Sequence, residues 1–173
     1  MKRKTHELAL ASMLGATAVV LLMLGGVIPL ATFACPVLAS IAILIAGEEC
    51  RKSYAWTCFA ASAILGLLLG PDKESALLFA FLGYYPLLQP RLDTLRPAPV
   101  RIVAKLALAV AAVGAMYALI LFVFRLEAVV QEFYAASPAV LWSTIALGLL
   151  LFLVYDLALH RLGALYRYRR RKQ

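Results

Sequence analysis

Charged residues are scarce in this chain. Only 15% of its 173 residues are charged and 64% are apolar, whereas soluble domains average about 25% charged and 45 to 50% apolar residues. At roughly 20 residues per membrane-spanning helix, the length allows about six spans joined by short loops. The composition excludes a large soluble catalytic or nucleic-acid-binding domain. It predicts an all-α integral membrane protein, with one transmembrane domain over residues 1–173.

Sequence motifs that carry catalytic chemistry are also missing. The chain has no Gly-x-Ser-x-Gly, no His-Glu-x-x-His and no glycine-rich phosphate loop. Its one acidic doublet, Glu48-Glu49, stands beside Arg51-Lys52, which is typical of a solvated turn. Because no nucleophile can be matched with a base, we expect a protein that is not an enzyme and uses no cofactor. A lipid-handling enzyme stays an alternative.

Cysteines are few. Cys35 falls near one predicted membrane face, and Cys50 and Cys58 fall near the other. No pair lies on the oxidising side, and the spacing does not match that of metal ligands. We therefore expect three buried or reduced thiols, without a disulfide or a metal site.

Apolar segments between the charges predict a compact bundle of six transmembrane helices. Residues 8–47 carry no charge, and as one helix they would be about twice as long as a bilayer core is thick. The segment must fold back, and Pro29 and Pro36 place the turn between them. The fourth predicted helix contains Gly83 and Pro86 and is expected to be short and kinked. The predicted helices cover about residues 8–29, 35–47, 54–70, 75–89, 101–124 and 137–159.

The basic residues predict the orientation of the bundle. With six spans, both termini and the loops after the second and fourth helices share one side. That side holds all of the 17 Lys and Arg except Lys73 and Arg125. Since cytoplasmic loops are rich in Lys and Arg, both termini are expected in the cytoplasm of a bacterial cell, and residues 160–173 form a basic tail near anionic lipid. The net charge of +8 thus reflects topology and does not require nucleic acid.

Few ionisable residues fall within the predicted spans. Asp156 and His160 are one helical turn apart near the predicted cytoplasmic end of the sixth helix, and Lys105 lies at the corresponding end of the fifth. We expect either a local pair or an ion pair with Lys105. Without ionisable groups deeper in the spans, a proton-coupled pump is not indicated.

Aromatic and polar residues at the predicted outer face are candidates for substrate binding. Small-molecule pockets are mostly apolar and contain a few orienting polar groups. The candidates are Phe33, Tyr117, Gln131, Glu132, Tyr134 and Trp142. Because carboxylates outnumber basic residues on this face, we expect a cationic or neutral heteroaromatic solute. The alternative is an interfacial belt of aromatic side chains.

Small residues at helical spacing mark the first, third and fifth predicted helices. Such residues let transmembrane helices approach closely. In the first helix they include Ala11, Ser12, Gly15 and Ala16. These residues serve either internal packing or contact with a partner.

The six-helix plan and the stretch Leu8-Ala-Leu-Ala-Ser-Met-Leu-Gly-Ala-Thr-Ala18 resemble the substrate-binding (S) components of energy-coupling factor (ECF) transporters. The resemblance implies a subunit that captures a small solute outside the cell and works with a transmembrane coupling subunit and ATPases. In that family an Ala-x-x-x-Ala pattern on the first helix docks onto the coupling subunit. The matching residues here are Ala11, Ser12, Gly15 and Ala16.

A second family has a similar plan. The chain also resembles MreD-type rod-shape proteins, which are non-enzymatic membrane scaffolds. This resemblance implies contacts with other envelope proteins in place of a solute.

Overall fold

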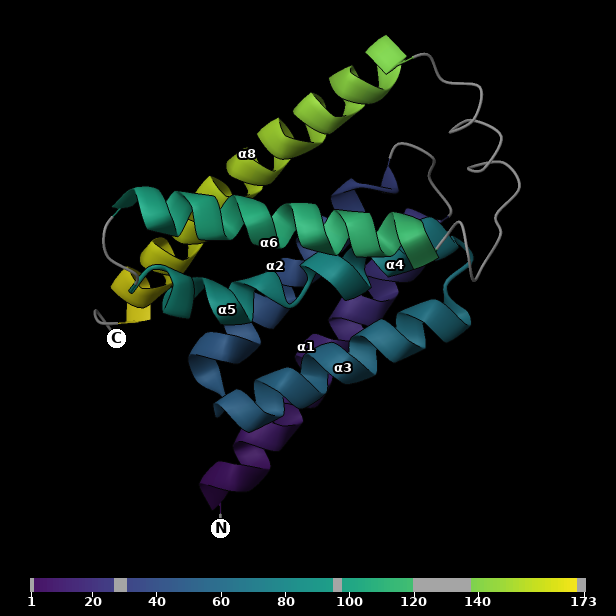
Figure 1. The fold of residues 1–173 in the computed structure, drawn as a ribbon. Coiled ribbons are helices and arrows are strands. Elements are labelled where there is room, and N and C mark those ends of the chain that lie inside the picture. Colours follow the sequence, from purple (N-terminus) through teal and green to yellow (C-terminus); the bar gives the residue numbers. More distant parts are fainter. Residues whose placement is uncertain (1, 27–30, 95–97, 120–137, 171–173) are drawn as a thin grey trace.

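The computed structural model describes residues 2–26, 31–94, 98–119 and 138–170, and the regular secondary structure in these ranges is entirely helical (Figure 1). The helices are α1 (Lys2–Gly25), α2 (Ala34–Glu49), α3 (Lys52–Leu69), α4 (Lys73–Leu82), α5 (Tyr85–Leu92), α6 (Ala98–Leu119) and α8 (Pro138–Arg170). The all-α class expected from the sequence is confirmed for this part of the chain.

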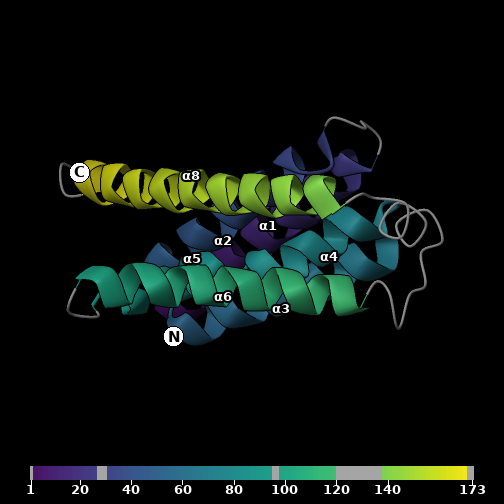
Figure 2. The same ribbon diagram turned by 45° about the horizontal axis from the view of Figure 1, so that its top comes forward.

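Successive helices run in alternating directions, except for α4 and α5 (Figures 1 and 2). Both termini lie at one end of the bundle, and the α1–α2, α3–α4 and α6–α8 connections lie at the other (Figure 2). Helices α4 and α5 follow one another from the second end to the first, so together they make one pass (Figures 1 and 2). We call the two ends the terminal end and the loop end.

Four of the described helices are long and apolar enough to cross a membrane. The qualifying segments are Thr5–Gly25, Lys52–Leu69, Pro99–Met116 and Ala146–Arg169. Helix α2 has 16 residues, and α4 and α5 have 10 and 8. These three helices correspond to the second and fourth spans expected from the sequence, and each alone is shorter than the roughly 20 residues that a span requires.

The kink expected near Gly83 and Pro86 is confirmed. The Gly83 N–H donates to the Phe79 carbonyl at 2.7 Å and closes α4. A Cβ atom at Gly83 would lie 2.5 Å from the same carbonyl oxygen, so only glycine fits this turn without displacement. Pro86 has no N–H to continue the α4 hydrogen-bond ladder and lies in the first turn of α5, which begins at Tyr85 as a new helix.

Three clusters of buried side chains join the described helices, and the smallest packs Leu77 of α4 against Met116 of α6. The two larger clusters define two contact regions. The first is the α1–α2–α3 region, where small side chains such as Ala18, Ala39 and Ala55 are fully buried. The second is the α5–α6–α8 region, where Tyr85 and Phe152 pack edge to face with ring centroids 5.1 Å apart. Alanines are frequent in the first region, although Phe79 of α4 also packs there, and aromatic rings are frequent in the second.

Helix α8 extends further than expected. It continues to Arg170 instead of ending near residue 159, so much of the expected basic tail is helical. The Tyr166 hydroxyl donates to Glu49 at 2.8 Å, and Arg167 forms an ion pair with Glu48 at 2.5 Å. The acidic doublet expected in a solvated turn thus ends α2 and anchors the last turns of α8.

Candidate functional site

The predicted substrate-binding residues lie only in part within the described chain. Phe33 precedes α2 at the loop end, and its side chain is 61% exposed. The backbones of Tyr117 in α6 and Trp142 in α8 belong to the same end. The side chains of Tyr117 and Trp142, and all of Gln131, Glu132 and Tyr134, lie outside the described residues. A shared cavity for this set stays a prediction.

The predicted docking residues divide between two faces of α1. Ala11 is buried, and its carbonyl accepts a hydrogen bond from the Cys58 thiol at 3.2 Å. The Gly15 carbonyl accepts from the Ser62 hydroxyl at 3.3 Å, and a Cβ atom at Gly15 would lie 3.3 Å from the Cys58 sulfur. Ala11 and Gly15 therefore form an internal contact with α3.

Ser12 and Ala16 lie on the exposed face of α1. The Ser12 hydroxyl is used locally, since it donates to the Leu8 carbonyl at 2.9 Å. Larger apolar side chains flank the two small residues, and Leu8 and Val20 are 53% and 55% exposed. Of the two predicted registers, Ala11 with Gly15 thus packs internally and Ser12 with Ala16 is exposed. Docking of a partner on this helix stays a prediction.

A group of polar side chains joins α5, α6 and α8 near the terminal end. Its acceptor is Asp156 of α8, which receives hydrogen bonds from the Tyr85 hydroxyl at 2.5 Å and the Gln89 amide at 2.9 Å. The Lys105 ammonium of α6 lies 3.0 Å from each Asp156 carboxylate oxygen. Lys105 also lies 2.7 Å from Asp93, just after α5. We call these five residues the Asp156 cluster.

The charged side chains of the Asp156 cluster are largely shielded from solvent. The Lys105 side chain is 10% exposed and that of Asp156 is 20% exposed. One cation thus faces two carboxylates, and His160 lies 3.4 Å from Asp93 at the exposed edge. Removing one partner of a buried pair leaves an uncompensated charge, which costs about 3–5 kcal/mol. The cluster therefore clamps three helices together.

The clamp leaves little acceptor capacity for a ligand. Both Asp156 carboxylate oxygens already accept hydrogen bonds from the chain's own side chains. Within the described residues, no group of three His, Cys, Asp or Glu side chains is placed to hold a metal ion. The arrangement is suited to fixing helices and not to acid–base chemistry or metal binding.

The sequence identified only part of this cluster. The expected ion pair between Lys105 and Asp156 is confirmed. Tyr85, Gln89 and Asp93 were missed, although a spacing of four residues predicts that they share one face of a helix. Tyr85 and Gln89 belong to α5, and Asp93 follows its last residue. The signal available in the sequence was the repeat of a polar side chain every four residues from Tyr85 to Asp93.

The three cysteines are free and buried. The Cys50 thiol lies between α2 and α3 and donates to the Glu7 carbonyl at 3.4 Å. Burial, followed by the nearby carboxylates of Glu7 and Glu49, raises the pKa of the Cys50 thiol. Cys50 is therefore a neutral and weakly reactive thiol at neutral pH.

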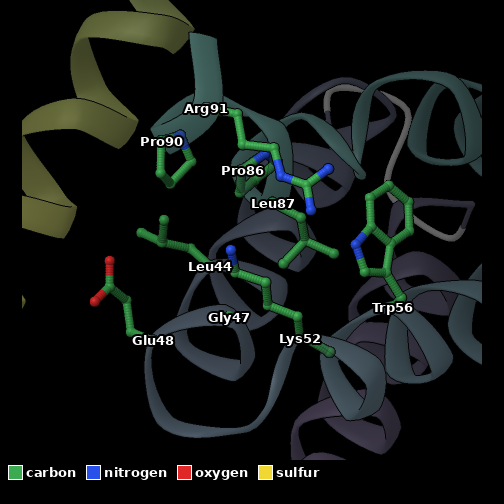
Figure 3. Close-up of a pocket in the computed structure, with 10 residues that line it drawn as sticks. Leu44, Gly47, Glu48, Lys52, Trp56, Pro86, Leu87, Pro90 and Arg91 are labelled. Atoms are coloured by element: carbon green, nitrogen blue, oxygen red, sulfur yellow. The ribbon is translucent and has the colours of Figure 1, made fainter. Parts of the chain in front are cut away.

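A groove of about 70 Å³ opens between α2, α3 and α5 at the terminal end (Figure 3). Pockets for drug-sized ligands measure about 300–1,000 Å³, so this groove cannot enclose such a molecule. Its polar lining consists of Glu48, Lys52 and Arg91, and Trp56 forms one wall. The groove lies at the opposite end of the bundle from the predicted substrate site.

Comparison of the chain with known proteins gives no relative. No family model, no curated protein and no solved structure matches it. A functional assignment therefore depends on the geometry of this chain.

Proposed function

We propose that this chain is a substrate-binding subunit of the bacterial cytoplasmic membrane that works with a separate ATP-hydrolysing module. It crosses the membrane six times, with both termini in the cytoplasm. Four apolar helices support the membrane location. The α4–α5 pair covers residues 73–92 and is roughly 30 Å long at 1.5 Å per residue, enough for one span.

The distribution of charge supports this orientation. Every described Lys and Arg except Lys73 belongs to the terminal end. Lys73 donates hydrogen bonds to the carbonyls of Leu67 and Gly70 at 2.7 and 3.0 Å, so its charge is placed against the C-terminal end of the α3 dipole. A basic terminal end on the cytoplasmic side agrees with the distribution in membrane proteins.

The orientation can be tested with single cysteines in a chain without native thiols. A cysteine at Lys73 should react with a membrane-impermeant thiol reagent in intact cells. A cysteine at Thr94, which is exposed at the other end, should react only after the cells are permeabilised. Labelling of both positions from the same side would contradict six spans.

One observation carries the substrate-binding assignment, namely the exposure of the described side chains in the first part of α8. Phe152, Tyr155 and Leu159 are buried, whereas no described side chain of α8 before Phe152 is buried. By contrast, α6 buries Ala109, Ala112 and Met116 in its second half. The described side chains of α8 before Phe152 therefore offer apolar surface to a solute at the loop end, to which Phe33, the end of α6 and the backbone of Trp142 also belong.

The proposed partners follow from the same arrangement. Membrane lipid covers the exposed apolar side chains along α3 and along the part of α8 that follows Tyr155. A transmembrane coupling subunit docks on the face of α1 that carries Ser12 and Ala16, because small residues permit close helix approach. The coupling subunit connects the chain to ATPases.

Native mass spectrometry of the tagged full chain, purified in detergent from its own membranes, tests the function. A bound cationic or neutral heteroaromatic molecule and co-purifying ATPase subunits are expected. Trp142→Ala should remove the small-molecule mass, while the matched control Trp56→Ala, at the other end of the bundle, should retain it. Association with envelope-assembly proteins and no small molecule would instead favour the MreD-type scaffold.

A further inference from the structure

The groove at the terminal end combines apolar walls with unneutralised positive charge. Leu44, Pro86 and Leu87 supply apolar surface from α2 and α5. Lys52 and Arg91 are exposed, and neither forms an ion pair with another residue in the described part of the chain. In Figure 3 the two cationic side chains extend over the groove from α3 and α5.

The carboxylate at the groove does not cancel this charge. Glu48 is paired with Arg167 of α8 at 2.5 Å. In Figure 3 its carboxylate points away from Arg91. Helix α3 also begins beside the groove without a side-chain cap on its first N–H groups, which adds positive potential. The local field therefore attracts an anion.

Trp56 indicates where the groove lies relative to the membrane. Its side chain is 37% exposed at the start of a helix that can span the bilayer. Tryptophan is enriched at the level of lipid headgroups, where its ring is partly apolar and its N–H is solvated. In the membrane orientation proposed above, on which this inference rests, a groove beside Trp56 meets the headgroups of the cytoplasmic leaflet.

We propose that this groove binds the headgroup of one anionic phospholipid. The phosphate lies between Lys52 and Arg91, the Trp56 ring packs at the glycerol level, and the acyl chains follow the apolar surface of α3 and α5 into the bilayer. The volume of about 70 Å³ suits a compact headgroup and leaves the chains outside. Basic pockets between transmembrane helices on the cytoplasmic side recognise lipid headgroups in this way.

Trp56 allows a direct test, because the chain has only two tryptophans. In a Trp142→Phe chain reconstituted in nanodiscs, Trp56 is the sole indole emitter. Phosphatidylglycerol with brominated acyl chains should quench Trp56 more strongly than brominated phosphatidylcholine at equal mole fraction. Equal quenching by the two lipids would overturn the proposal.

Two charge-matched double variants separate a local site from general attraction. Each nearby cation contributes about fivefold to the affinity for anionic lipid, so Lys52→Gln with Arg91→Gln should lower the relative affinity by about 25-fold. Arg161→Gln with Arg169→Gln removes the same charge from exposed residues of α8 and should leave the preference nearly unchanged. Equal losses in both variants would reduce the effect to surface potential and overturn the proposal.

Single variants and free phosphate complete the test. If the double variant does not fold, Arg91→Gln alone should lower the relative affinity by about fivefold. Millimolar inorganic phosphate should not displace the lipid, because it lacks acyl chains to bury. Displacement by phosphate would assign the groove to a soluble anion and overturn the lipid site. None of these outcomes depends on whether the chain binds a solute at the loop end.

Discussion

The α1–α2–α3 region and the α5–α6–α8 region solve the same packing problem with different chemistry. In the first, small residues bring backbones close enough for the Cys58 and Ser62 side chains to donate to carbonyls of α1. In the second, the Lys105 ammonium of α6 bridges two carboxylates, that of Asp93 just after α5 and that of Asp156 in α8. The first region depends on shape and the second on charge.

This difference determines what each region tolerates. A close backbone contact has no space for added volume, and the contacts of Ala11 and Gly15 with α3 involve no charged group. A buried ion pair accepts small shifts in packing, but it is destabilised strongly when one charge is removed. Substitutions that change only volume or only charge should therefore separate the two regions.

Lys105→Met should give the largest loss of stability. It leaves Asp93 and Asp156 without their shared cation in a nearly enclosed cluster, at a cost of about 3–5 kcal/mol. The measurement is the free energy of unfolding of the purified chain in mixed micelles. Arg101→Met is the matched control on the same face of α6, one turn earlier and half-buried. Equal losses in the two variants would show that the cluster is not a clamp.

Gly15→Leu should give the next largest loss. A Cβ atom at this position already lies 3.3 Å from the Cys58 sulfur and 3.4 Å from the Ser62 oxygen, and overpacking of this kind costs about 1–3 kcal/mol. The unfolding measurement is the same as for Lys105→Met. A Gly15→Leu chain as stable as the parent would contradict close packing between α1 and α3.

Ala16→Leu is the matched variant of Gly15→Leu on the exposed face of α1. The added side chain points away from α3, so stability should change by less than about 0.5 kcal/mol. Co-purification of the proposed coupling subunit should be lost, since the helix contact needs small residues. Retention of the partner would place the docking surface elsewhere.

The sequence predicted the features that depend on local rules. Helical class follows from uninterrupted apolar runs, and the break at Gly83 and Pro86 follows from a missing N–H and a turn that excludes a side chain. The ion pair of Lys105 with Asp156 follows because a charge within an apolar helix requires a partner. The first two conclusions use residues that are neighbours in the sequence. The ion pair could be predicted because the predicted spans contain few charged residues that could be partners.

The features that the sequence did not predict depend on which helix faces meet. Ala11 and Gly15 lie about 100° around α1 from Ser12 and Ala16, and only the position of α3 decides which pair is internal. The extension of α8 to Arg170 was missed because its last turns are basic and resembled a tail. Their contact with Glu48 at the end of α2 is a tertiary contact that no local pattern contains.

Cys50 provides a test of charge at the edge of the α1–α2–α3 region. Because burial and the Glu7 and Glu49 carboxylates raise its pKa, the folded chain holds the thiol proton more tightly than the unfolded chain does. The associated stability is present at neutral pH and is lost as the pH rises through the folded pKa. In a Cys35→Ala, Cys58→Ser chain, alkylation at pH 8 should be slower than that of free cysteine. Equal rates would mean that Cys50 is accessible and unshifted.

His160→Gln should have the smallest effect. The imidazole lies 3.4 Å from Asp93, but its side chain is 59% exposed, and exposed ion pairs contribute about 0–1 kcal/mol. Asp93 keeps Lys105 at 2.7 Å in the variant, so the Asp156 cluster retains its cation. The unfolding free energy should fall by less than about 1 kcal/mol, in the assay used for Lys105→Met. A loss as large as that of Lys105→Met would mean that the clamp extends to the surface of α8, and that His160 carries part of the charge that holds α5 and α8 together.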